Sequence, residues 1–345
     1  MNTQEAVQQI RQSPLAPVYL VTGTEDYLVQ EIRQAFMDRM KIDDLEELNF
    51  MSFDMDESNL GAVIDEAETL PFFGDYRLIF AENPSFLTGE KKNNSQEQDI
   101  DSLLAYLKQP VETSVMVFWA NYPKLDARKK ATKALKKTTI IDAAPLQERD
   151  LRNFLQRYIS NENVKISREA FDLFLRLTDF DLSKAMNEIE KLLLLAGEGG
   201  TITLQLVEDL VPKTLEHNIF ELTEQILKGD TGKAYQTYEE LHLQGEETIK
   251  LTAILIGQIR LLLQTKILQK IGYQQANIAE TLGVHPYRVK LAMQQVAKFP
   301  LNLLVSMYDE LVENDYEVKT GQAEKELNFQ LFILKTTEQI KQKRA

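Results

Sequence analysis

The sequence contains no cysteine among its 345 residues. This absence excludes a disulfide framework, a cysteine nucleophile and any thiolate-bound metal or iron–sulfur cluster, and it fits a reducing cytoplasm. The first residues, MNTQEAVQQIRQS, lack the apolar core of a signal peptide, and no run approaches the ~20 apolar residues of a membrane span. We therefore expect a soluble, cytoplasmic protein without a membrane partner.

The common catalytic and cofactor-binding motifs are also missing. A phosphate-binding loop needs glycines followed by Lys-Ser/Thr, whereas the turn at Thr22–Asp26 (TGTED) supplies two carboxylates where a phosphate binder needs a cation. The three histidines, His217, His242 and His285, lie in different segments without His-Glu-x-x-His spacing. The acidic segment Asp54–Ser58 lacks the glycine of a calcium loop, so helix capping explains it better. We expect no catalytic residue, no cofactor and no metal site.

Positive charge is scarce. The chain has 53 acidic and 39 basic residues and a formal net charge of -14, so autonomous tight binding to nucleic acid is disfavoured. Basic residues are concentrated only at Lys124–Lys137, which contains seven of them and one Asp. As a helix, this segment places Lys129, Lys133 and Lys136 or Lys137 on one face. Two interpretations are open, a solvated face or a DNA contact through Lys129, Lys130, Lys133 and Lys137.

The N-terminal part of the chain alternates short apolar strands with amphipathic helices. This pattern predicts an α/β domain at residues 1–142 with a mostly parallel sheet and helices on both faces. Helices are expected to begin near Thr24 or Asp26 and at Ser58, and the second ends before Pro71. The predicted strands are Val18–Val21, Asn49–Phe53, Arg77–Phe80, Val115–Trp119 and Ile140–Asp142.

After Pro145 the strand pattern ends and helical periodicity takes over. Three amphipathic helices predict a small helical domain at residues 143–211: Leu151–Ile159, Ser167–Leu177 and Leu182–Leu195. Pro212 then separates a larger all-helical domain at residues 212–345.

Two adjacent aromatic residues lie on the connection before the third strand, in Leu70–Gly74 (LPFFG). Pro71 stops the helix and Gly74 permits an unusual turn. Neighbouring side chains of an extended segment point in opposite directions, so Phe72 and Phe73 cannot easily enter one core. Either both are core residues at a sheet edge, where Phe is usually buried, or they form an aromatic plug for a partner's pocket.

Residues Ile278–Lys290 have the pattern of a helix-turn-helix, with a small Ala279, Gly283 at the turn and an apolar Val289. A DNA-reading module is one interpretation. However, the second helix begins His-Pro-Tyr-Arg rather than with several polar base readers, and two helices joined by a tight turn are common in helical bundles.

Five segments in this order resemble the delta-subunit family of the bacterial DNA polymerase III clamp loader. The resemblance implies an AAA+-like domain unable to bind ATP, a helical lid and a C-terminal helical collar that joins the other loader subunits. The segments are Pro17–Gly23 with Glu25 and Tyr27-Leu28, Lys124–Lys130, Asn187–Leu192, Asn218–Leu222 and Ile278–Lys290.

The same resemblance implies a role in DNA replication. The chain would be a non-catalytic subunit of a DNA-directed DNA polymerase (nucleotidyltransferase) holoenzyme. It would grip the sliding clamp and hold the ring open, sibling subunits would supply the ATP chemistry, and primed DNA would be met only within the assembled loader.

The family's clamp-binding element lies at the end of the helix before the third strand and finishes in two large apolar residues. The resemblance therefore assigns clamp binding to Leu70, Pro71, Phe72 and Phe73. Glu68 stands where some members have Gln, and Pro71 where some have Ser. The alternatives are a helix-turn-helix regulator, which would bind duplex DNA with sequence preference, and a degenerate AAA+ ATPase, which would bind ATP.

Overall fold

The computed structural model describes residues 1–41, 48–72, 74–89 and 98–344. The chain divides into two compact units. The first comprises Met1–Asn161 with Asp181–Glu190, and the second comprises Glu162–Phe180 with Lys191–Ala345.

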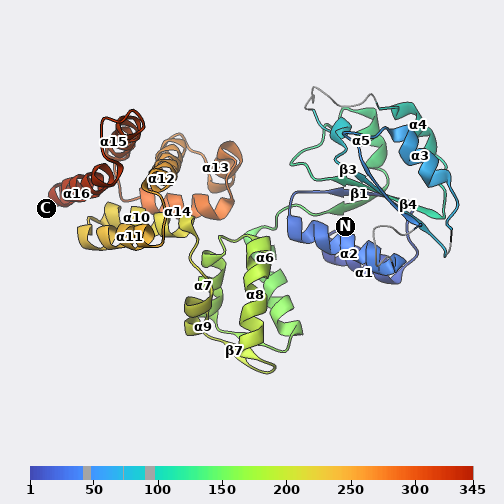
Figure 1. The fold of residues 1–345 in the computed structure, drawn as a ribbon, viewed down its shortest axis with the longest axis horizontal. Helices are drawn as coiled ribbons and strands as arrows, with labels where there is room; N and C mark the ends of the chain where they lie inside the picture. Colours follow the sequence, from blue (N-terminus) through green and yellow to red (C-terminus); the bar gives the residue numbers. More distant parts are fainter. Residues whose placement is uncertain (42–47, 73, 90–97, 345) are drawn as a thin grey trace. The chain divides into compact units, whose positions relative to one another are not determined.

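A parallel sheet forms the centre of the first unit, with strand order β2-β3-β4-β1-β5 within the described residues (Figure 1). All five predicted strands are confirmed, and the middle strand β4 is buried along its whole length because helices cover both faces. The strands are β1 (Val18–Thr22), β2 (Phe50–Asp54), β3 (Arg77–Glu82), β4 (Ser114–Ala120) and β5 (Thr139–Asp142).

Helices on opposite faces of the sheet receive alternate strand residues. On one side, α3 (Leu60–Glu68), α4 (Ile100–Tyr106) and α5 (Lys130–Leu135) pack on a core that includes Leu20, Ile79 and Phe118. The opposite side is covered by α1 (Thr3–Gln12) and α2 (Asp26–Met40) (Figure 1). There Phe36 of α2 meets Tyr19 edge to face, with ring centroids 5.0 Å apart. The helix α6 (Glu148–Asn161) and the start of α8 (Leu182–Ala196) complete this unit.

Helix starts differ from the sequence predictions in three places. Helix α1 was not predicted, and Asn2 and Glu5 form a capping box at its start. Helix α2 follows Glu25, which makes no side-chain cap bond, so neither Thr24 nor Asp26 caps it. The prediction that Ser58 caps α3 is wrong, because the Asn59 side chain accepts the cap bond from the Ala62 N–H at 2.9 Å.

The second unit is helical apart from the short parallel pair β6 (Lys165–Ile166) and β7 (Thr201–Ile202). Its long helix α12 (Thr248–Lys270) is apolar enough, by length and composition, to cross a membrane. Leu255, Ile259 and Leu262 of α12 are fully buried in the unit's core, so we interpret α12 as a core helix. The others are α7 (Arg168–Leu177), the end of α8, α9 (Leu204–Leu210), α10 (Leu215–Lys228), α11 (Thr231–Leu243), α13 (Gln275–Leu282), α14 (Pro286–Val296), α15 (Leu301–Lys319) and α16 (Lys325–Arg344).

Helices α13 and α14 form the predicted helix-turn-helix. Gly283 ends α13 in the left-handed region at φ 64°, and Ile278, Ala279 and Val289 share a small buried cluster. In the first turn of α14, Tyr287 is buried and its ring lies 3.7 Å from that of Phe180. Because this side chain packs inside its own unit, it is not presented to a DNA groove, and the geometry favours a bundle element.

Candidate partner-binding loop

The candidate loop runs from the end of α3 to the start of β3. Apolar residues of α3, including Val63 and Ala67, are buried, which fixes the direction in which the helix ends. At its end, the Thr69 hydroxyl donates to the Asp65 carbonyl oxygen at 3.0 Å. Pro71 has no N–H with which to extend the helix. The residues that follow α3 therefore leave the helical path.

Hydrogen bonds anchor this loop on three sides. The buried Ser114 hydroxyl donates to the Ala67 carbonyl oxygen at 2.6 Å. Arg77, at the start of β3, forms an ion pair with Glu66 of α3, in which its Nε donates at 2.7 Å. The Phe72 N–H donates to the Asn49 side-chain oxygen at 2.6 Å, which ties the loop to the residue before β2. The backbone of the loop is therefore held in place while its side chains extend outward.

The side chains of this loop are largely exposed. Leu70 is 73% exposed and Phe72 is 66% exposed, while Pro71 is half-buried. Phe73 lies outside the described residues. The interpretation of both rings as core residues is therefore wrong for Phe72.

Three residues near the loop were missed by the sequence analysis. Asn49 accepts the Phe72 N–H, and it is flanked by Leu48 (62% exposed) and Met51 (41% exposed). Their signal is weak in the sequence, because Leu and Met beside a predicted strand are usually assigned to the core.

The basic segment does not form a single lysine face. Lys130, Lys133 and Lys137 are exposed on or next to α5. Lys129 precedes the helix, is half-buried, and its ammonium donates to the Phe86 carbonyl oxygen at 2.9 Å. Nearby, hydrogen bonds from Arg128 lower the pKa of Asp126 to about 2. Lys129 thus fastens a neighbouring loop, which distinguishes it from the other three lysines.

The chain itself occupies the position where a phosphate-binding loop would lie. Gly23 has φ +113°, and a Cβ there would be 2.1 Å from the carbonyl carbon of Ala143. The Glu25 N–H donates to the Ala143 oxygen at 3.0 Å, and the Tyr27 N–H donates to the Ser183 hydroxyl at 3.1 Å. These N–H groups are therefore engaged within the chain.

A carboxylate reinforces this closure. Glu25 is only 8% exposed and accepts a 2.7 Å hydrogen bond from the Ser183 hydroxyl of α8. Burial raises the pKa of the Glu25 carboxyl. A buried acid at this turn is unfavourable for phosphate, as the sequence indicated.

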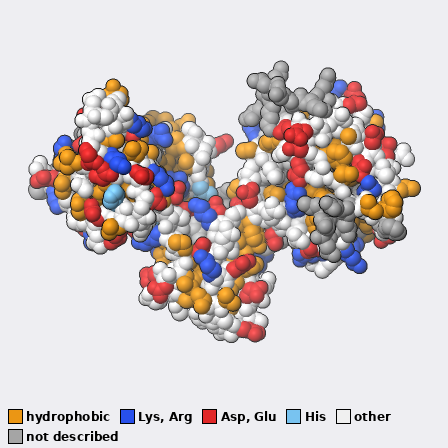
Figure 2. All heavy atoms as spheres, in the orientation of Figure 1, with side chains coloured by type: hydrophobic (Ala, Val, Ile, Leu, Met, Phe, Trp, Pro, Cys, Tyr) orange, Lys and Arg blue, Asp and Glu red, His pale blue; other side chains and the backbone are white. Residues whose placement is uncertain are grey.

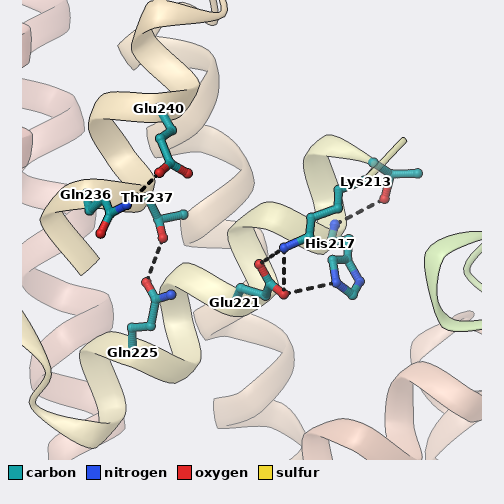
Figure 3. A network of polar contacts seen from close by, with 8 residues as sticks. Lys213, His217, Glu221, Gln225, Gln236, Thr237 and Glu240 are labelled. Carbon is teal, nitrogen blue, oxygen red and sulfur yellow. Dashed lines mark hydrogen bonds and ion pairs between the residues drawn. The ribbon is translucent and has the colours of Figure 1, made fainter. Parts of the chain in front are cut away.

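In the second unit, the principal polar cluster is structural. Figure 3 shows Lys213 and His217 pointing toward Glu221 of α10. Lys213 Nζ lies 2.8 Å and His217 Nε2 lies 3.3 Å from the carboxylate. The hydrogen bond from His217, followed by Lys213, lowers the pKa of Glu221 to about 2 despite partial burial. In the described part of the chain, no group of three or more His, Asp or Glu side chains could hold a metal ion.

The fold defines the class first: an AAA+-like α/β domain followed by a helical C-terminal part, as predicted. Comparison with known proteins then identifies the family. The model described as "DNA polymerase III, delta subunit" matches residues 19–144, the model of its C-terminal domain matches residues 216–336, and a middle-domain model matches residues 147–209.

Curated relatives and a solved structure agree. The chain is 39% identical to the Bacillus subtilis DNA polymerase III subunit delta over 330 residues, or 94% of each chain. It is 20% identical to the probable delta subunit of Aquifex aeolicus over 83% of this chain and 81% of that one. The structure of the Bacillus subtilis DNA clamp loader delta protein matches with a TM-score of 0.78 and 38% identity, covering 97% of this chain and 99% of that one. The chain belongs to the delta-subunit family of DNA polymerase III, and the resemblance found in the sequence is confirmed.

Proposed function

We propose that the chain is a non-catalytic clamp-loader subunit that acts in DNA replication in the cytoplasm. It binds the sliding clamp through Leu70, Pro71, Phe72 and Phe73 and holds the ring open for loading onto primed DNA. Family membership supports the role in clamp loading. The observation that carries the binding site is the exposure of Phe72 and Leu70 on a loop whose backbone is anchored.

The energetics of two aromatic rings suit this task. Burying roughly 200 Å² of one ring at roughly 25 cal/mol per Å² gives about 5 kcal/mol of gross attraction. An anchored backbone lowers the entropy lost on binding, because the loop is already ordered. Only a difference in affinity between the open and closed clamp shifts the ring's equilibrium. The wedge must therefore fit a clamp pocket best when the neighbouring interface is distorted.

The division of labour follows from the three proposed domains. Residues 1–142 carry the clamp-binding element, residues 143–211 form the lid, and residues 212–345 form the collar that joins the other loader subunits. The three family-model matches, at 19–144, 147–209 and 216–336, support these boundaries. The closed turn at Gly23 and Glu25 supports a subunit whose siblings supply the ATP chemistry.

Contact with primed DNA is a second, auxiliary part of the proposal. Exposed Lys130, Lys133 and Lys137 are the candidates, and Lys129 contributes less because its ammonium is bound to Phe86. The net charge of -14 restricts this contact to the assembled loader.

A pull-down of the sliding clamp without nucleotide tests the binding site. Wild-type chain is expected to retain the clamp, and the Phe72→Ala/Phe73→Ala double variant is expected to lose it. The same variant should still assemble with the other loader subunits, because the substitutions lie outside the collar. Retention of the clamp at wild-type affinity by the double variant would show that the site is assigned wrongly.

A further inference from the structure

We propose that the clamp-binding surface extends beyond the loop onto the start of β2, where Leu48 and Met51 form a second apolar anchor. This inference rests on the proposed function, because it gives the anchor the same partner. We refer to Leu48 and Met51 as the flanking pair.

The flanking pair lies at the same end of the sheet as the loop. Strands β2 and β3 are parallel, with Phe50 opposite Leu78, and the Leu78 N–H donates to the Asn49 oxygen at 2.8 Å. Asn49, between the two members of the pair, also accepts the Phe72 N–H. A contact of the backbone of Phe72 with Asn49 therefore joins the two surfaces directly.

The orientation of Met51 follows from the strand's alternation. Phe50 packs against Phe80, with ring centroids 5.1 Å apart, so Met51 points to the other face of the sheet, which α3 covers. Helix α3 connects two parallel strands, so it runs back along the sheet and ends near the start of β2. Met51 therefore stands beside the end of α3, from which Leu70 and Phe72 project.

Four large apolar side chains are thus exposed at one end of the sheet. Their exposed fractions are 62% for Leu48, 41% for Met51, 73% for Leu70 and 66% for Phe72. Single exposed apolar residues are ordinary, whereas a cluster of them marks an interaction site. The cluster is continuous with the loop proposed to bind the clamp, so the clamp is the partner that covers it.

The charges around the cluster describe the partner's complementary surface. Glu68 and Asp75 are exposed on either side of the loop. We infer that the clamp presents an apolar depression with basic residues at its rim, because acidic flanks attract cations and repel anions. The flanking pair would fill the part of that depression that the loop leaves open.

Nucleotide-free equilibrium titration of the clamp tests the second anchor. We expect Leu48→Ala and Met51→Ala each to weaken binding by about 3- to 10-fold and the double variant by about 10- to 100-fold, as typical of secondary residues beside a hot spot. Met51→Glu should weaken binding more, because it places a charge in an apolar contact. Leu243→Ala is the matched control, since Leu243 is a leucine 82% exposed in the second unit, and its affinity should equal that of the wild type.

The outcomes separate this inference from the proposed function. If Phe72→Ala/Phe73→Ala abolishes binding while Leu48→Ala/Met51→Ala and Met51→Glu bind like the wild type, the second anchor is refuted and the loop alone is the site. If the Phe double variant binds like the wild type, the proposed function is overturned and the second anchor with it. Thermal unfolding at wild-type temperature should accompany every weakened variant, because all of these side chains are exposed.

Discussion

At the scale of single residues, Gly23 shows why a turn that resembles a phosphate-binding position cannot act as one. Its φ of +113° and the close approach of Ala143 leave no room for a side chain. We expect Gly23→Ala to lower the free energy of unfolding by at least ~3 kcal/mol, from backbone strain and a clash with a backbone carbonyl. Gly245 has φ +87° with nothing within 4 Å, so Gly245→Ala should cost only about 1 kcal/mol. Urea denaturation measures both, and equal costs would contradict this account of Gly23.

Asn49 allows a second prediction at the residue scale. Asn49→Ala removes the acceptor of the Phe72 N–H and should weaken clamp binding about 10-fold, because an unanchored loop loses more entropy on binding. Asn49→Asp keeps an acceptor oxygen and should retain most of the affinity. A titration in which both variants bind equally well would remove Asn49 from the positioning role.

The residue scale is also where prediction from sequence was weakest. The exposure of Phe72 does not follow from composition, because Phe is usually buried, and only the family resemblance assigned it to a binding role. Lys129 was grouped with its neighbours by helical spacing, but α5 begins at Lys130 and the ammonium of Lys129 reaches a backbone carbonyl. Local spacing does not reveal such tertiary contacts.

At the scale of helices and strands, the sequence was a better guide where burial is complete. Strand β4 was predicted well because its continuous apolar run is buried on both faces. Helix α1 was missed because it buries only Thr3, Ala6 and Ile10, so its periodic signal is weak. The start of α3 was misplaced by one residue, since Ser58 and Asn59 are both good caps and only the structure shows which one accepts the bond.

Helix α10 carries a prediction about pH. The lowered pKa of Glu221, about 2 against an ordinary 4.5, means that the carboxylate stabilises the fold above about pH 4.5 and that this contribution is lost as the pH falls toward 2. Because the side chain is 33% exposed, we expect Glu221→Gln to cost only about 1 kcal/mol at pH 6. The difference between wild type and variant in urea denaturation should shrink below pH 4.5.

Glu240→Gln provides the control for this experiment. Glu240 of α11 accepts a 2.8 Å hydrogen bond from the Gln236 amide (Figure 3). Its replacement should change the free energy of unfolding by less than about 0.5 kcal/mol. A Glu221→Gln cost that stays constant from pH 6 to pH 3 would show that the Lys213 and His217 contacts do not stabilise the helix.

At the scale of the whole molecule, charge and the closed turn set the limits of what the isolated chain does. Acidic and basic side chains are interspersed on the face drawn in Figure 2, consistent with a chain that meets DNA only inside an assembly. We expect Mg-ATP at millimolar concentration to leave the unfolding temperature unchanged relative to magnesium alone, because the N–H groups of Glu25 and Tyr27 are bound within the chain. A saturable rise would instead support a degenerate ATPase.

The central claim is that exposed aromatic side chains on an anchored loop trap the open ring of the clamp. Energy transfer between dyes placed on the two sides of one clamp interface measures this opening directly. Without nucleotide, the wild-type chain should lower the transfer efficiency in a saturable way, and Phe72→Ala/Phe73→Ala should leave it at the level of the free clamp. Equal opening of the ring by the wild type and the double variant would contradict the account.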